Sequence, residues 1–174
     1  MIRRGVSIIE AVACVAIVGG LAIAIINTVG SIGRARVSAG ERADGQILAA
    51  DLLAEVTSRR YAEDLAAKVQ ALGPEADETL AADRSSFDDV DDYAGLVDPS
   101  ADGGVPRTRE GADVPGVGSG WVRRVDVARV SPADLSPSVT DHGLLLVTVT
   151  VERGGRMIAR LSAVRARAAE EAPR

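Results

Sequence analysis

Carboxylates are the residues of this sequence whose type and spacing suit them to chemistry. They occur in two places. Glu10 stands alone at the end of Arg3-Arg4-Gly5-Val6-Ser7-Ile8-Ile9-Glu10, at the front of a long apolar run. A cluster lies in Ser85-Ser86-Phe87-Asp88-Asp89-Val90-Asp91-Asp92-Tyr93. A charged side chain at the centre of a bilayer costs about 2.5–3.5 kcal/mol on insertion scales. Glu10 therefore needs a functional or positional reason.

The acidic cluster has two interpretations. One is a calcium site, because carboxylate oxygens are the ligands that calcium prefers. Its candidate ligands are Asp88, Asp89, Asp91 and Asp92. The spacing is not that of an EF-hand, since the loop glycine and the terminal glutamate are missing. The other interpretation, which we favour, is a solvated acidic turn. Its Phe87, Val90 and Tyr93 would dock on the head, which is the folded part of the chain beyond the apolar run. We therefore predict no cofactor and keep calcium as the alternative.

Catalytic constellations are absent from the sequence. The single histidine, His142, lies in an Asp141-His142-Gly143 turn, where a surface position is expected. No nucleophile elbow, P-loop or dinucleotide fingerprint occurs, so we expect no enzyme. The lone Cys14 excludes an intrachain disulfide. The net charge of -5, without a basic patch interleaved with aromatics, argues against a nucleic-acid partner.

The apolar run predicts a membrane segment. Residues 11–26 contain no charge, and with residues 6–9 the run reaches the roughly 20 residues that cross a bilayer as a helix. Arg3 and Arg4 precede it, which places the N-terminus in the cytoplasm. A cleavable secretory signal would have a small-residue site after the run, but Ala22-Ile23-Ala24 lies inside it. We therefore expect a single-pass protein with an extracytoplasmic head.

The residues from Arg3 to Glu10 resemble the type IV prepilin signature. In that family a short basic leader ends in glycine, and a hydrophobic residue, Ser or Thr, two aliphatics and a glutamate follow. Val6 stands where phenylalanine is commonest, and Ile8 where leucine is common. The match covers only the start of the chain. The acidic cluster also resembles a segment found in some minor pilins of the mannose-sensitive haemagglutinin pilus type.

The resemblance implies a processing and assembly route. Prepilin peptidase would cleave between Gly5 and Val6 at the inner membrane, and the new Val6 amine would be methylated. Glu10 would then neutralise the N-terminal ammonium of a neighbouring pilin or pseudopilin subunit in a pilus or a type II secretion pseudopilus. The competing function is a monomeric single-span protein whose head binds a ligand or hydrolyses a substrate. Gly5 and Glu10 discriminate between the two, because only the assembly route needs both.

The remaining pattern predicts an α+β, pilin-like fold, in which a long N-terminal helix packs on a small antiparallel sheet. After the leader, residues 1–5, we expect one helix from Val6 to about Arg60, with a further turn or two towards Leu72. Residues 6–27 are its membrane and assembly part, and residues 28–72 its outer part. Its apolar stripe contains Ile47, Leu48, Leu52, Val56 and Leu65. Four glycines lower its helix propensity: Gly30, Gly33, Gly40 and Gly45.

Glycines and prolines divide the rest of the head into segments. Glycines and prolines make residues 73–120 an irregular, acidic region. Residues 121–165 read as three antiparallel strands, with Gly154-Gly155 as the turn of the last hairpin. The clearest alternation places Leu145, Val147, Val149 and Val151 on the buried face, and Met157, Ala159, Leu161 and Ala163 follow on the return strand. Residues 166–174 form an expected frayed tail.

Overall fold

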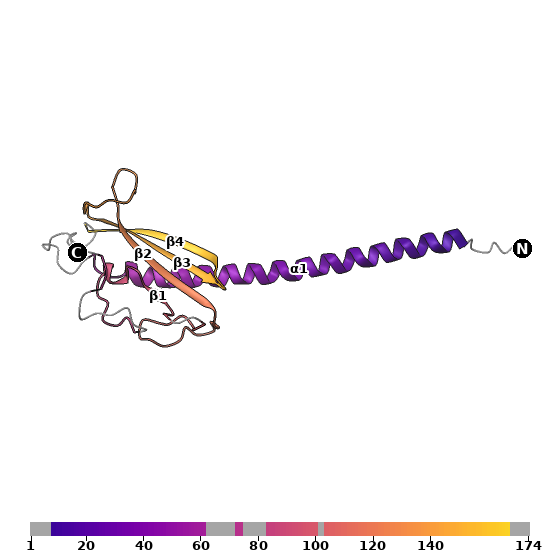
Figure 1. Cartoon of the computed structure of the whole chain (residues 1–174), viewed down its shortest axis with the longest axis horizontal. Coiled ribbons are helices and arrows are strands. Elements are labelled where there is room, and N and C mark those ends of the chain that lie inside the picture. The colour runs from indigo at the N-terminus through magenta and orange to yellow at the C-terminus, as the bar shows by residue number, and fades with distance from the viewer. Residues whose placement is uncertain (1–7, 62–71, 75–82, 101–102, 168–174) are drawn as a thin grey trace, which may run out of the picture. The chain divides into compact units, whose positions relative to one another are not determined.

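The computed structural model describes residues 8–61, 72–74, 83–100 and 103–167. Its elements are helix α1 (Ile8–Thr57), the 3-10 helix η1 (Asp91–Tyr93) and strands β1 (Val97–Asp98), β2 (Trp121–Arg129), β3 (Leu144–Arg153) and β4 (Arg156–Ala166), all shown in Figure 1. The α+β prediction is confirmed. The chain divides into two compact units, Met1–Glu41 and Arg42–Arg174, which are described separately.

In the N-terminal unit, α1 carries its apolar residues on every side. Ile8, Val15 and Ile26 are 83%, 73% and 70% exposed. These positions point in different directions around a helix of 3.6 residues per turn, so this part of α1 has no polar face. A helix that is apolar all round needs a partner surface or a lipid environment.

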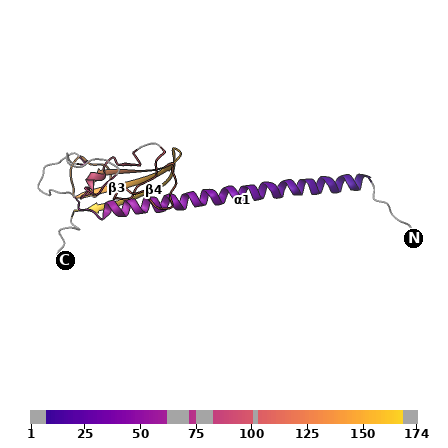
Figure 2. The same cartoon turned by 90° about the horizontal axis from the view of Figure 1, so that it is seen from below.

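In the C-terminal unit, the last turns of α1 pack on the sheet, as Figure 2 shows. The stripe that faces inward consists of Gly45, Leu48, Ala49, Leu52 and Val56. These positions recur at helical spacing, which aligns them on one face. Three of the five residues predicted for the stripe are therefore confirmed. Ile47 is 66% exposed and was wrongly placed there, and Leu65 lies outside the described residues.

Gly45 allows the helix to approach the sheet closely. A Cβ atom added at Gly45 would lie 2.6 Å from Ile158 Cγ2 and 3.4 Å from the Trp121 ring. Real Cβ atoms essentially never approach another atom as closely as the 2.6 Å to Ile158 Cγ2, so this packing requires glycine. The residue that lowers helix propensity thus sits where the tertiary contact needs the smallest side chain.

The helix ends at Thr57, earlier than expected. The Arg59 carbonyl, just beyond its last turn, accepts hydrogen bonds from Arg165 Nε and Nη2 at 3.2 and 3.0 Å. The chain then forms a parallel bridge between Arg60 and Asp89. Residues 58–61 are therefore not helical, and residues 62–71, where a continuation towards Leu72 was expected, lie outside the described residues.

The sheet has the order β1-β2-β3-β4 and all neighbours are antiparallel. The buried face of β3 is the predicted one, with Val147, Val149 and Val151 inaccessible to solvent. The β3–β4 hairpin turns at Gly154 and Gly155, as predicted, and both have positive φ. A register irregularity at Val151/Glu152 interrupts the alternation, and Met157 is 60% exposed where burial was expected.

Two elements lie in the region expected to be irregular. Strand β1 pairs with β2 through Val97 and Asp98, whose partners are Arg124 and Arg123. Helix η1 places Tyr93 in the core, where its ring meets Phe87 edge-to-face at 5.0 Å and 81°. The tail was expected to begin at Ala166, but Ala166 is the last residue of β4 and the Arg167 amide donates to the Gly143 carbonyl at 2.9 Å. Residues 168–174 lie outside the described residues.

Candidate functional site

The N-terminal motif is only partly described. Gly5 and Val6 lie outside the described residues. Glu10 lies in the first turn of α1, and its side chain is exposed. Its neighbours in the helix are exposed aliphatic residues, Ile8, Ile9 and Val12 among them. A lone carboxylate thus sits at one end of an apolar surface.

One helix among the described residues is long and apolar enough to cross a membrane, and it is α1. None of its most apolar window is buried against the rest of the chain. The core helix of a soluble protein would be mostly buried. The finding is consistent with a single membrane span or with a signal sequence.

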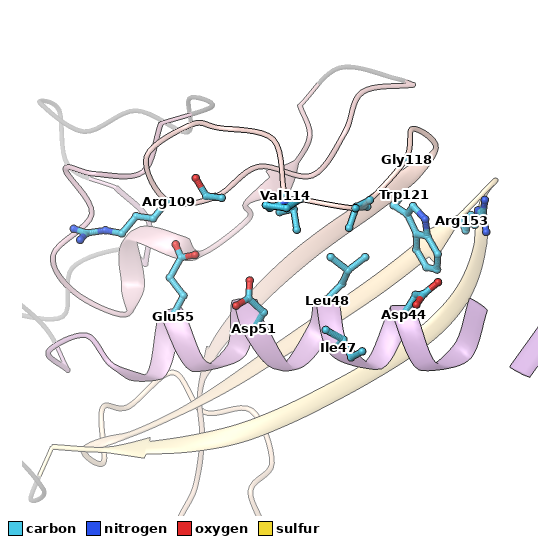
Figure 3. A pocket seen from close by; sticks show the side chains of 14 residues that line it. Asp44, Ile47, Leu48, Asp51, Glu55, Arg109, Val114, Gly118, Trp121 and Arg153 are labelled. Carbon is cyan, nitrogen blue, oxygen red and sulfur yellow. The ribbon is translucent and has the colours of Figure 1, made fainter. Parts of the chain in front are cut away.

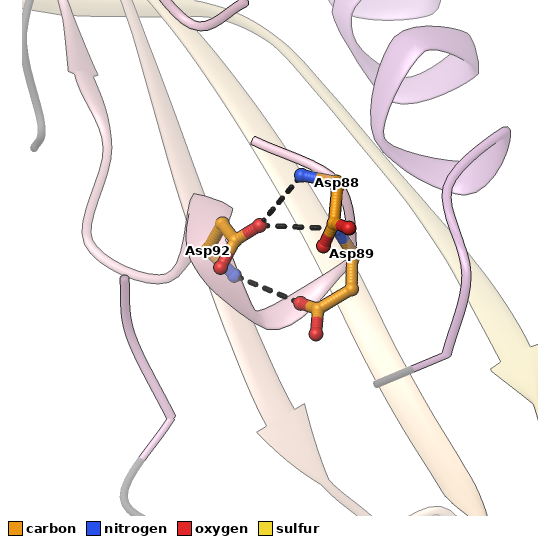
Figure 4. Close-up of side chains that lie close together, drawn as sticks. All are labelled: Asp88, Asp89 and Asp92. Carbon is orange, nitrogen blue, oxygen red and sulfur yellow. Dashed lines mark hydrogen bonds between the residues drawn. The ribbon is translucent and has the colours of Figure 1, made fainter. Parts of the chain in front are cut away.

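The acidic cluster is a hydrogen-bonded turn (Figure 4). Asp92 Oδ2 accepts hydrogen bonds from the Asp88 and Asp89 backbone amides at 2.9 and 3.0 Å. Asp89 Oδ1 accepts from the Asp91 amide at 2.9 Å and from the Asp92 amide at 3.4 Å. The two carboxylates therefore organise the backbone that leads into η1, which is a structural role.

The expectation of a solvated cluster is wrong. Asp89, Asp91 and Asp92 are buried, and Asp88 is partly exposed in an ion pair with Arg60 at 2.8 Å. The docking part of that interpretation is confirmed, since Phe87, Val90 and Tyr93 are inaccessible to solvent. The acids are buried because the three apolar residues carry the segment into the core. Backbone amides then donate to Asp89 Oδ1 and Asp92 Oδ2, whereas Asp92 Oδ1 is buried without a hydrogen-bond partner among the described residues.

The candidate calcium ligands are only partly brought together. Carboxylate oxygens of Asp88, Asp89 and Asp92 lie within 4.8 Å of one another, whereas Asp91 is not in this group. Such a triad could hold a hard cation by its chemistry. Two of its members already accept backbone hydrogen bonds, which account for one oxygen each of Asp89 and Asp92 without a ligand.

A buried charge network lies beside the cluster, and the sequence analysis did not predict it. Arg84 and Arg123 are inaccessible to solvent. Arg84 Nε and Nη2 donate to the two Glu55 oxygens, each at 3.0 Å, and Arg123 Nε donates to Asp98 Oδ2 at 2.9 Å. Asp98 Oδ1 accepts from the Arg107 amide at 3.0 Å. The network thus joins α1, the segment before η1, β1 and β2.

The network favours the ionised form of the Glu55 carboxyl. Burial alone raises the pKa of the Glu55 carboxyl, but the hydrogen bonds and charge of Arg84 and the hydrogen bond from Tyr93 outweigh it and hold the pKa below its ordinary value. Burial and the adjacent Glu55 carboxylate raise the pKa of Tyr93, whose hydroxyl donates to Glu55 Oε1 at 2.9 Å. Glu55 therefore stays ionised in a largely buried position.

A groove of about 630 Å³ lies between α1 and the segment 108–118 (Figure 3). Leu48, Val114 and Trp121 form its apolar floor, and Asp44 and Asp51 lie on its helix wall. The Arg153 guanidinium lies 4.9 Å from the centre of the Trp121 ring. Carboxylates and arginines line the groove beside its apolar residues, a combination that is typical of binding sites.

Comparison of the chain with protein-family models, with curated proteins and with solved structures finds no match. The fold itself is pilin-like, because a long N-terminal apolar helix packs its last turns on an antiparallel sheet. The resemblance to type IV prepilins otherwise depends on the residues from Arg3 to Glu10.

Sequence reasoning missed the Arg84–Glu55 pair, the Arg123–Asp98 pair and the groove. A signal existed for Arg123, which occupies the inward position between Trp121 and Val125 in a strand that alternates. No comparable signal marks Arg84, because its surroundings are made by segments far apart in the chain.

Proposed function

We propose that this chain is a structural subunit of a type IV pilus or of a type II secretion-type pseudopilus, held in the inner membrane and polymerised through α1. The observation that carries the proposal is the apolar surface of α1 between Ile8 and Ile26, which has no polar face and is not buried against the rest of the chain. Such a surface can be covered by lipid before assembly and by the same helix of neighbouring subunits afterwards.

The residues around Gly5 supply the chemistry of assembly in this proposal. Prepilin peptidase hydrolyses the Gly5–Val6 bond and frees the Val6 amine, which is then methylated. Glu10 follows Val6 by about 6 Å along a helix. In a bundle of helices it reaches the ammonium of an adjacent subunit, which would otherwise be buried without a counter-charge. The proposal assigns no reaction to the head.

The test is the intact mass of the protein purified from membranes of a bacterium that carries prepilin peptidase. We expect a chain that begins at Val6 with one added methyl group. A matched Gly5→Leu variant should keep residues 1–5, because the residue before the cleaved bond is changed. Recovery of the full leader in the unchanged protein, or cleavage near Ala24, would contradict the proposal.

The groove favours a second candidate, a monomeric single-span protein whose head binds a ligand. Its apolar floor and its few polar groups are typical of small-molecule and peptide sites. This candidate needs neither removal of the leader nor Glu10. A protein that keeps its leader and never associates with other prepilins would support it.

A further inference from the structure

The groove has an acidic wall whose charges are incompletely neutralised. Asp44 makes no hydrogen bond or ion pair within the described part of the chain. Asp51 is 67% exposed and meets a single cation, Arg123, at 3.6 Å. Since seven residues separate Asp44 from Asp51, both lie on one face of α1, about 10 Å apart.

The cations that line the groove are engaged elsewhere. Arg109 donates to the carbonyl oxygens of Arg84, Ser85 and Phe87. The Arg153 guanidinium stacks on the Trp121 ring. The groove therefore presents two exposed carboxylates beside an apolar floor, and its complement is a cation flanked by aliphatic and small residues.

This chain contains such a segment in its N-terminal unit. Arg36 is exposed on α1 and has no hydrogen bond or ion pair among the described residues. Gly33 and Gly40 flank it at i−3 and i+4, and Ile32, which is 49% exposed, lies at i−4. Open space surrounds the Cα atoms of both glycines, so another backbone can come close to this face of the helix.

We propose that the groove of one copy binds the Arg36 face of α1 from a second copy, with the Arg36 guanidinium between Asp44 and Asp51 and Ile32 on the apolar floor. The inference depends on the proposed function, because it names a contact by which subunits associate. Arg34 is two residues away and points to another side of the helix, which makes it the matched control.

The test uses the full chain with two different tags, co-produced in a bacterium that has a type IV pilus assembly system. In a Cys14→Ala background, one copy carries Arg36→Cys and the other carries Asp44→Cys. We expect disulfide-linked pairs of the two tags at several-fold higher yield than with Arg34→Cys or with Arg160→Cys on the exposed face of β4. Equal yields from all three partners would overturn the inference.

Charge exchange gives a second, independent readout in the protein that retains Cys14. Asp44→Arg in one copy should lower co-isolation of the two tags by about tenfold or more, because a like-charge contact replaces an ion pair. Asp44→Asn should lower it by about twofold to fivefold. Arg36→Asp in the second copy should restore co-isolation with Asp44→Arg. Failure of this rescue would also overturn the inference.

A crosslink through Cys14 separates failure of this contact from failure of the proposed function. Cys14 is exposed on the apolar part of α1 and reports association of the helices themselves. If copies crosslink through Cys14 but not between positions 36 and 44, the subunits assemble and only the groove contact is wrong. If neither pair of positions crosslinks, the filament proposal and this inference fail together.

Discussion

Arg84 donates two parallel hydrogen bonds to the Glu55 carboxylate, each 3.0 Å long, across 29 residues of sequence. The Arg84 side chain is 1% exposed and that of Glu55 is 14% exposed. The pair ties the end of α1 to the segment that enters η1. Because water is largely excluded, removal of either partner leaves the other charge with little compensation.

Arg84→Met should therefore destabilise the head by about 3–5 kcal/mol. The matched control is Arg60→Met, because the Arg60–Asp88 pair is exposed and such pairs contribute about 0–1 kcal/mol. Urea unfolding of a fragment that starts at Thr28 measures both. That fragment lacks the apolar run, and we expect it to be soluble. Equal losses in the two variants would contradict the structural role of the Arg84 pair.

Stability should fall in mild acid. The pKa of Glu55 is lower in the folded head than in the unfolded chain, so its contribution is complete above its ordinary value of 4.5 and is lost as pH falls through the folded value. Burial raises the pKa of the Asp141 carboxyl, but hydrogen bonds from Tyr61 and the Gly143 amide outweigh burial, so the pKa lies below its ordinary value. Asp141 therefore loses stabilising interactions over the same fall in pH. Melting curves from pH 6 to pH 3 should show a shallower fall for Glu55→Gln.

Gly45→Ala should destabilise the head although alanine is the better helix former. The new methyl group would meet Ile158 Cγ2 at 2.6 Å, and overpacking of this kind costs about 1–3 kcal/mol. Gly40→Ala is the control, since nothing lies within 4 Å of its added Cβ, and it should stabilise α1 by about 1 kcal/mol. Thermal unfolding of both variants in the fragment gives the signs, which should be opposite.

Calcium should change the stability of the head little, because backbone amides already occupy oxygens of Asp89 and Asp92. Asp92→Ala should instead destabilise the head in the absence of calcium by about 1–3 kcal/mol, since one buried and one partly buried amide lose their acceptor. The melting temperature with and without millimolar calcium checks the first statement. A rise of many degrees that is lost in Asp92→Ala and in Asp88→Ala would show a metal site at the triad.

Glu10→Ala should leave membrane insertion and leader cleavage intact and impair assembly. The change removes a charge from the apolar run, so insertion becomes slightly easier. In the proposed filament, the Val6 ammonium of a neighbour would then be buried without a partner, a penalty of several kcal/mol. Incorporation into sheared filaments, compared at equal abundance in the membrane, is the measurement. Wild-type incorporation would reduce Glu10 to a tolerated edge residue.

The local pattern of hydrophobic residues was sufficient to predict most of the fold. The period of two in Leu145, Val147, Val149 and Val151 identified β3, and the two glycines after it identified the hairpin. The period of 3.6 identified the helix but misplaced Ile47, which neighbours the stripe in projection. Ile47 and Leu48 are adjacent aliphatic residues, and the position of the sheet decides which of them faces the core. The helical period alone does not show on which side of the helix the sheet lies.

The candidate site depended on contacts that no local pattern encodes. Asp98 reads as a loop acid, yet it lies in β1 because Arg123 of the neighbouring strand is buried and binds it. The aspartates of the cluster were predicted to be solvated, because charged side chains in proteins are mostly exposed. Their burial follows from Phe87 and Tyr93, whose rings meet in the core, and from amides that the same turn supplies.

The order of elements along the chain has a consequence for biosynthesis. Leu48, Leu52 and Val56 share one buried cluster with Val147, Val149 and Val151 of β3, which begins only at Leu144. Until the ribosome has released β3 and β4, this stripe of α1 has no native cover and is exposed to misassociation. The head can therefore complete its folding only after the C-terminal hairpin has been synthesised, and a chain truncated before Leu144 should be a substrate for chaperones and proteases.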